Sequence, residues 1–238
     1  MAKKMSFRFR RLVGFLLSLA ILSFVIYQSA PPIETAVEPV VEQPAKVESS
    51  VVPGSAMEAL AALPIKGRAP KTDYSRDQFG SGWTTIDGCD TRNIILNRDL
   101  IDVEKNEKCE VVRGTLNDSY TGNIIIFERG ASSSAIQIDH VVALSDAWQK
   151  GAQSLTRDQR IALANDPLEL IAADGPANQQ KSDGDAATWL PSNKPFRCQY
   201  VARQIAVKQK YSLWVTQAEH DAMSNILNTC PDQVLPQP

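Results

Sequence analysis

Four widely spaced cysteines constrain the fold of this chain more than any other feature of its 238 residues. Cys89, Cys109, Cys198 and Cys230 follow one another at separations of 20, 89 and 32 residues, without the close pairs that a structural zinc site normally shows. Four cysteines allow three disulfide pairings. We favour Cys89 with Cys109 and Cys198 with Cys230, because each bond then closes a local loop in one part of the fold.

The N-terminal segment indicates that the chain leaves the cytoplasm for a compartment in which disulfides persist. Five basic residues precede an uncharged, mainly apolar run from Leu12 to Tyr27, which is the order of a secretion signal. We assign residues 1–30 to a signal peptide or a membrane anchor. Gln28 and the following prolines make a poor cleavage site, which favours the anchor.

A linker and one folded domain follow this segment. Residues 31–56 are rich in Pro, Val, Glu, Ala and Ser and show no sustained helical or strand period, so we expect a disordered spacer. Residues 57–238 are long enough for one well-buried core, and we expect a single domain and a monomer. The formal net charge of -2 argues against charge-driven packaging of nucleic acid.

Short patterns of secondary structure predict an α+β fold. Residues 110–116 and 123–128 are the predicted arms of a β-hairpin, and Asp90 is expected to cap a short helix over 91–96. Further along the chain we expect a strand over 135–139 and helices over 141–150, 156–164, 200–210 and 216–229. Thr216 and Glu219 have the spacing of a capping box for the last helix. Strands therefore precede helices, which is typical of the α+β class.

Two polar stretches hold the residues suited to chemistry. The chain has only two histidines, and one of them, His140, follows Asp139 where the predicted strand passes into the next helix. Neighbouring side chains on a regular strand face opposite sides, so this pair can serve one site only if the strand ends there. The second stretch, residues 174–185, supplies Asn178, a lysine and several acidic side chains that could face a phosphate and a cation. We expect the other histidine, His220, on the surface.

The ordered set of motifs resembles the HNH, or His-Me finger, endonucleases, which have a ββα-metal core. More narrowly, it resembles secreted bacterial HNH proteins related to the nuclease part of modification-dependent restriction enzymes. The resemblance runs from Gly82 through residues 87–93, the Asp-His pair and residues 178–181 to residues 189–191, and ends near Cys230. It implies a ββα-metal core with an N-terminal β-hairpin and C-terminal helices, held by disulfides.

The resemblance implies roles for three residues: His140 is the general base, and Asp139 and Asn178 are metal ligands. The chemistry agrees, because imidazole, with an ordinary pKa of about 6.5, can accept a proton from water near neutrality. A divalent ion held by a carboxylate and an amide oxygen can neutralise charge in the transition state. Oxygen ligands favour Mg²⁺ or Mn²⁺ over zinc. The products that the family implies are a 5′-phosphate and a 3′-hydroxyl.

Three further residues extend the predicted site or depart from the family pattern. We assign Lys181 and Arg203 to substrate binding, with a solvated surface position as the alternative for each. Glu169 stands nine residues before Asn178, where the family usually has an Asn that pins the metal loop by hydrogen bonds. An ionised Glu accepts such bonds but cannot donate them, which puts the rigidity of the loop in question.

These features predict a metal-dependent endonuclease that hydrolyses phosphodiester bonds of DNA, with RNA left open as a substrate. We expect it to be exported, and either anchored in the membrane by its N-terminal segment or secreted. The alternative is a non-catalytic envelope module that keeps a degenerate HNH scaffold to bind a partner.

Overall fold

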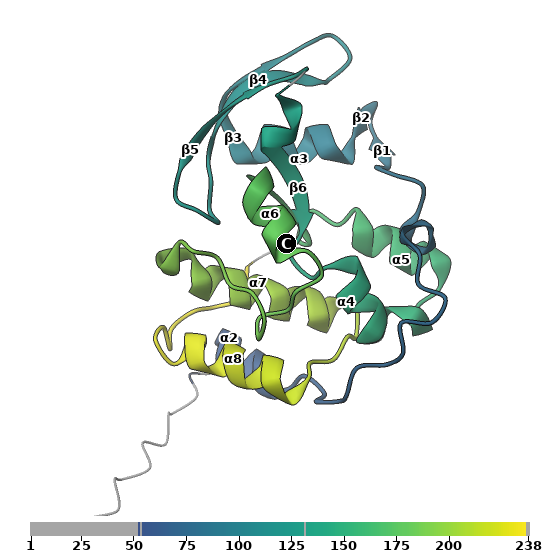
Figure 1. Ribbon diagram of the computed structural model, residues 1–238, viewed down its shortest axis with the longest axis vertical. Coiled ribbons are helices and arrows are strands. Elements are labelled where there is room, and N and C mark those ends of the chain that lie inside the picture. The colour runs from purple at the N-terminus through teal and green to yellow at the C-terminus, as the bar shows by residue number, and fades with distance from the viewer. Residues whose placement is uncertain (1–51, 53, 131, 237–238) are drawn as a thin grey trace, which may run out of the picture. The chain divides into compact units, whose positions relative to one another are not determined.

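The structure is a computed structural model, and it describes residues 52, 54–130 and 132–236. The predicted signal peptide or anchor and nearly all of the predicted linker lie outside the described residues. Within the described ranges, no helix is long and apolar enough to cross a membrane. In the view of Figure 1, a three-stranded sheet occupies one end of the described fold and helices α7 and α8 the other, with β6 and α6 between them.

An antiparallel sheet confirms the predicted hairpin and adds a strand to it. β4 (Val111–Asn117) and β5 (Ile124–Glu128) are the two arms of the hairpin. β3 (Leu100–Lys105), which the sequence did not predict, pairs with the other edge of β4. The sheet therefore has the order β3, β4, β5.

Helix α3 (Thr91–Asp99) leads into this sheet and is fixed at its start. The predicted cap is confirmed, because the Asp90 carboxylate accepts a hydrogen bond from the backbone N–H of Asn93 at 2.7 Å. The helix extends beyond its predicted end at residue 96. Before it, β1 (Thr85–Ile86) and β2 (Cys89–Asp90) form a short antiparallel pair. The predicted disulfide between Cys89 and Cys109 is present and joins this pair to the turn between β3 and β4.

Two strands from distant parts of the chain pair beside a short helix. β6 (Ile136–His140) confirms the predicted strand and lies antiparallel to β7 (Leu170–Asp174). Helix α6 (Gly175–Lys181) begins directly after β7 and packs against both strands. A Cβ atom on Gly175 would lie 2.3 Å from the backbone oxygen of Ser134, so only glycine allows this close approach. The local order is therefore strand, strand, helix.

Helix α4 (Leu144–Gln149) begins later than the predicted start at residue 141. The backbone N–H of Val141 donates to the carbonyl of Glu169 at 2.9 Å, and that of Val142 donates to the Glu169 carboxylate at 3.2 Å. These bonds hold the chain out of the helix for three residues after β6. The site residues at the end of β6 consequently lie on extended backbone.

The remaining helices contribute many of the buried residues of the larger hydrophobic core. They are α2 (Ala56–Ala61), α5 (Arg157–Ala164), α7 (Arg197–Lys210) and α8 (Gln217–Leu227). The last three confirm predicted helices, with ends shifted by up to three residues. A smaller core lies between α3, the three-stranded sheet and the β6–β7 pair; its largest buried members are Ile95, Leu96, Phe127, Ile136 and Leu170. Mixed sheets and helices in this order give the α+β class that the sequence predicted.

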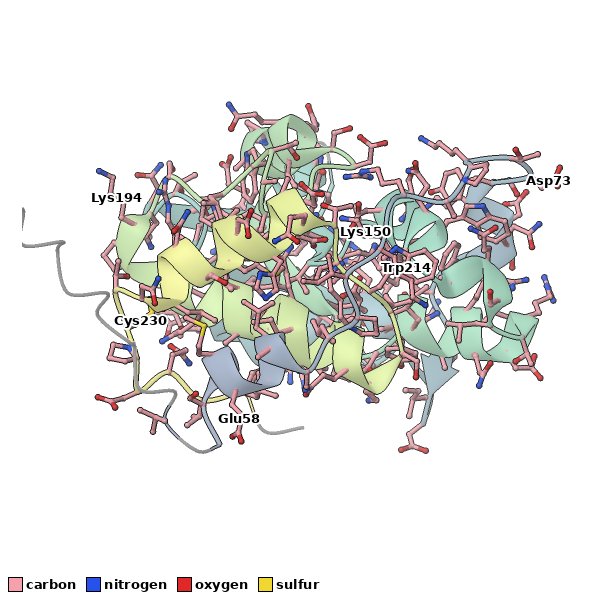
Figure 2. The ribbon with its side chains drawn as sticks, turned by 90° about the horizontal axis from the view of Figure 1, so that it is seen from below. Glu58, Asp73, Lys150, Lys194, Trp214 and Cys230 are labelled. Atoms are coloured by element: carbon pink, nitrogen blue, oxygen red, sulfur yellow. A yellow bond between two sulfur atoms is a disulfide. The ribbon has the colours of Figure 1, made fainter. Side chains whose placement is uncertain are left out.

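A disulfide and a buried ionic cluster connect the C-terminal helices. The predicted bond between Cys198 and Cys230 is present and joins the start of α7 to the end of α8; Cys230 is labelled in Figure 2. The fully buried ammonium of Lys150, also labelled there, lies 2.8 Å from Asp185 and 2.6 Å from Glu219. The carboxylate of Glu219 therefore does not complete the predicted capping box, although Thr216 does cap α8.

Candidate active site

Asp139 and His140 lie at the last two positions of β6 and share one pocket. Both side chains are buried, with exposed fractions of 5% and 6%. They line a cavity of about 330 Å³ together with Asn178, which comes from α6. Because the strand ends at His140, neighbouring residues can face the same space, as the sequence argument required.

The imidazole of His140 is held in one orientation. Its Nε2 lies 3.0 Å from the backbone oxygen of Ala164, at the end of α5. A carbonyl only accepts, so Nε2 carries the hydrogen in this bond and Nδ1 is left as an acceptor. The Trp83 ring lies nearly parallel to the imidazole, with 5.8 Å between the ring centres. The ring therefore has a fixed tautomer and a fixed plane.

The surroundings of His140 favour its neutral form. Burial lowers its pKa from 6.5 to about 3, and the positive charges of Arg76 and Lys181 act in the same direction. The bond to Ala164 opposes these effects. A neutral imidazole is the form that can accept a proton from water.

Asp139 is held by two donors. The hydroxyl of Tyr120 donates to Oδ2 at 2.5 Å, and the ammonium of Lys181 donates to Oδ1 at 3.0 Å. Burial raises the pKa of the Asp139 carboxyl, and the charge of Lys181 counters that rise. Each carboxylate oxygen has a second lone pair, so these contacts leave acceptor capacity for a further ligand.

Lys181 is fully buried in the structure. Its ammonium donates to Asp139 and also to the backbone oxygen of His140 at 2.7 Å. These contacts make it a charge partner of Asp139 and a support for the end of β6. The predicted contact of Lys181 with phosphate stays a prediction.

Asn178 presents a free oxygen to the pocket. Its amide nitrogen donates to the side-chain oxygen of Gln137 at 2.9 Å, while its Oδ1 accepts no hydrogen bond from the described residues. This oxygen and the Asp139 carboxylate suit Mg²⁺ or Mn²⁺, which prefer oxygen ligands and retain several waters. No three His, Cys, Asp or Glu side chains in the described ranges form a metal-binding group. The pocket therefore offers two side chains with oxygen atoms of the kind that such a cation prefers, Asp139 and Asn178.

Glu169 pins the backbone that follows His140. As described above, its carbonyl and its Oε2 accept the N–H groups of Val141 and Val142. Its other oxygen, Oε1, has no hydrogen-bond partner among the described residues. Burial raises the pKa of this carboxyl well above its ordinary range. Glu169 thus holds backbone at the position where the HNH resemblance implied an Asn.

Arg203 does not line the pocket that holds Asp139 and His140. Its guanidinium donates to the backbone oxygens of Pro167, Leu168 and Leu170 at 2.7 to 2.9 Å. Arg203 thereby braces the loop that presents Glu169. Its assignment to substrate binding stays a prediction. The remaining histidine, His220, is partly exposed on α8 and lines none of the three cavities around this site.

Sequence reasoning missed several residues of the site. Tyr120 and Gln137 hold the proposed ligands, and Trp83 and Arg76 line the space around His140. Tyr120 was assigned only to the hairpin turn, and the one available signal was an aromatic residue in an otherwise polar turn. Gly82–Trp83 contributed only to the family resemblance.

Comparisons with known proteins agree with the nuclease resemblance. The chain is 36% identical over 216 residues to an uncharacterized secreted protein of Arthroderma benhamiae (strain ATCC MYA-4681 / CBS 112371), an alignment that covers 89% of this chain and 98% of that protein. That relative is fungal, whereas we expected a bacterial branch. No solved structure matches the chain. Residues 90–226 match the family model described as GmrSD restriction endonucleases, C-terminal domain, and the chain belongs to that family.

Proposed function

We propose that this protein is a metal-dependent endonuclease of the HNH type that hydrolyses phosphodiester bonds of DNA. The observation that supports this best is the shared pocket of Asp139, His140 and Asn178, built on two antiparallel strands and the helix that follows them. Membership of a restriction-endonuclease family supports a nucleic acid as the substrate class.

His140 acts as the general base in this proposal. With Nε2–H held by the Ala164 carbonyl, Nδ1 accepts a proton from a water molecule as the water oxygen attacks phosphorus. The bond from phosphorus to the 3′ oxygen breaks, and the 3′ oxygen takes up a proton from solvent water, which leaves a 5′-phosphate and a 3′-hydroxyl. Asp139 and Asn178 would hold a divalent ion, whose contribution is to neutralise charge on the phosphate.

We also propose that the protein acts outside the cytoplasm. The N-terminal charge pattern, the two disulfides and the secreted relative support export. Anchoring in the membrane rests on the apolar run and the poor cleavage site after it, which lie outside the described residues.

Nicking of a supercoiled plasmid tests the activity directly. We expect conversion to the open circle with Mg²⁺ or Mn²⁺ and none with EDTA. His140→Ala should lower the rate by about 10² to 10⁴, the usual contribution of a positioned base. Asp139→Asn and Asn178→Ala should raise the metal concentration needed for half-maximal rate.

His220→Ala is the matched control and should retain the wild-type rate. If folded wild-type protein cleaves neither plasmid nor RNA with either ion, the endonuclease proposal is wrong. Binding of a partner on a degenerate HNH scaffold would then be the better account.

A further inference from the structure

Three neighbouring cavities share one wall, and His140 lines two of them. The first, of about 160 Å³, lies beside Trp83, and the second is the site pocket of about 330 Å³. A third, of about 560 Å³, continues past Ser182 and Asp183. The second cavity shares lining residues with each of the other two, so the three lie next to one another. Residues 68–83 contribute to all three.

This wall segment, residues 68–83, is fixed to helices α4 and α5. The Trp148 indole donates to the backbone oxygen of Thr72 at 3.2 Å, and the Arg160 guanidinium donates to that of Gln78 at 2.9 Å. Phe79 is buried and packs edge-on against Trp148. The segment is therefore held in place before any substrate binds, which lowers the entropy lost on binding.

Arg76 differs from the other basic residues of the wall segment. Arg68 is paired with Asp146 and Asp185, and Lys71 is paired with Asp183. Arg76 is exposed, and no carboxylate of the described residues lies within 4.0 Å of its guanidinium. It lines both of the cavities that touch His140.

The charge of Arg76 acts on the site itself. Burial lowers the pKa of His140, and the charge of Arg76 contributes in the same direction. Burial raises the pKa of Tyr74, which lines the same pocket, and the positive charge of Arg76 opposes that rise. A guanidinium placed there without a carboxylate partner suits an anionic oxygen of a phosphate, because its planar fork can bind two such oxygens at once.

Building on the endonuclease activity proposed above, we propose that Arg76 binds the phosphate group next to His140 and that residues 68–83 form the substrate-binding wall. These residues precede the stretch matched by the family model, 90–226. Part of the substrate-binding surface would then be formed by a segment that lies before the stretch matched by the family model.

Cleavage kinetics on a short labelled DNA duplex with Mn²⁺ test this assignment. Arg76→Ala should lower kcat/KM by about 10- to 100-fold, the effect expected when a hydrogen bond to a charged group is lost. The kcat/KM of Arg76→Lys should lie between those of wild type and Arg76→Ala. Lysine keeps the positive charge but loses the planar guanidinium that can bind two oxygens at once. Arg113→Ala is the control: Arg113 is exposed on β4, pairs only with Glu128 and lines none of the three cavities.

Binding measured without cleavage separates this inference from the activity itself. In a His140→Ala background with EDTA, fluorescence anisotropy of the same DNA gives affinity as a function of salt. Adding Arg76→Ala should weaken binding and reduce the salt slope by about 1, as expected for one lost phosphate contact. If wild type cleaves but Arg76→Ala matches Arg113→Ala in both assays, the role of Arg76 is refuted while the endonuclease stands. If wild type neither cleaves nor binds DNA, both proposals fail.

Discussion

Glu169 is fully buried, yet one of its two carboxyl oxygens has no partner among the described residues. A charged carboxylate in that position would be poorly solvated, and burial accordingly raises its pKa. A protonated carboxyl can both donate and accept a hydrogen bond, as an amide can. A neutral Glu169 can therefore replace the Asn that the family resemblance led us to expect, and the loop need not lose rigidity.

The raised pKa of Glu169 makes stability depend on pH in a definite direction. The unfolded chain loses this proton near its ordinary pKa of about 4.3, whereas the folded protein keeps it to higher pH. The folded state then binds more protons, so the contribution to stability is complete below about pH 4.3 and is lost as pH rises towards the folded pKa.

Glu169→Gln should remove this pH dependence, because Gln is neutral and of similar shape. Relative to wild type, the variant should gain stability by up to about 1.4 kcal/mol per pH unit as pH rises from about 4.3 towards the folded pKa of Glu169. Urea unfolding of both proteins at several pH values measures the difference between their free energies of unfolding. The contributions of the other titrating groups are the same in both proteins and cancel in this difference. A difference that stays constant with pH would contradict the assignment.

The sequence could predict the candidate residues of the site but not what holds them. Asp139 and His140 are adjacent, and Asn178 and Lys181 are one helical turn apart, so their spacing was informative. The contact of Tyr120 with Asp139 joins residues 19 positions apart and exists only after the hairpin packs beside β6. Burial of Lys181 likewise depends on where β6 ends. The spacing of residues in the sequence therefore predicts neither the contact of Tyr120 with Asp139 nor the burial of Lys181.

At the scale of elements, the site depends on how closely α6 approaches the segment before β6. A methyl group on residue 175 would meet the backbone oxygen of Ser134, and backbone cannot move aside as a flexible side chain can. Asn178 lies one turn further along the same helix, so a displaced α6 also displaces the proposed ligand.

Gly175→Ala should therefore destabilise the fold by about 1 to 3 kcal/mol, the usual range for overpacking, and also lower nicking activity. Gly67→Ala is the matched control, because no atom lies within 4 Å of a Cβ built there. Thermal unfolding followed by circular dichroism gives the stability of each variant, and the plasmid assay gives the activity. Equal behaviour of the two variants would show that the close approach at Gly175 is not maintained in solution.

Elements with a clear local pattern were predictable, and those defined by pairing were not. The hairpin arms and helices α5, α7 and α8 follow from period and turn residues. β7 is a short apolar run that periodicity cannot distinguish from buried helix. It becomes a strand because it pairs with β6, whose paired residues lie 30 to 38 positions earlier in the chain. β3 is mostly exposed and charged, so only its pairing with β4 defines it.

At the scale of the whole described fold, covalent and ionic links join distant elements. Both disulfides match the pairing that we favoured among the three possible ones, in which each bond closes a local loop. The sequence does not predict the ionic cluster, because Lys150 lies 35 residues from Asp185 and 69 from Glu219. Removing one member would leave an unpaired buried charge, so the cluster favours one arrangement of α4 and α8.

The bond between Cys198 and Cys230 should contribute to global stability without taking part in catalysis. It closes a loop of 32 residues, and neither cysteine lines the cavities around His140. Cys198→Ser combined with Cys230→Ser should lower the free energy of unfolding by about 2 to 5 kcal/mol, because the unfolded chain regains the freedom that the bond removes. The nicking rate at a temperature where the variant is folded should match wild type.

Urea unfolding with and without a thiol reductant provides the control for this prediction. Reduction opens both bonds of the wild-type protein, so its midpoint should fall below that of the double variant measured without reductant. The same reductant should destabilise the double variant through the bond between Cys89 and Cys109 alone. If the double variant is as stable as wild type under non-reducing conditions, the ionic cluster and the helix packing suffice to hold α7 and α8 together, and the bond has no measurable share in global stability.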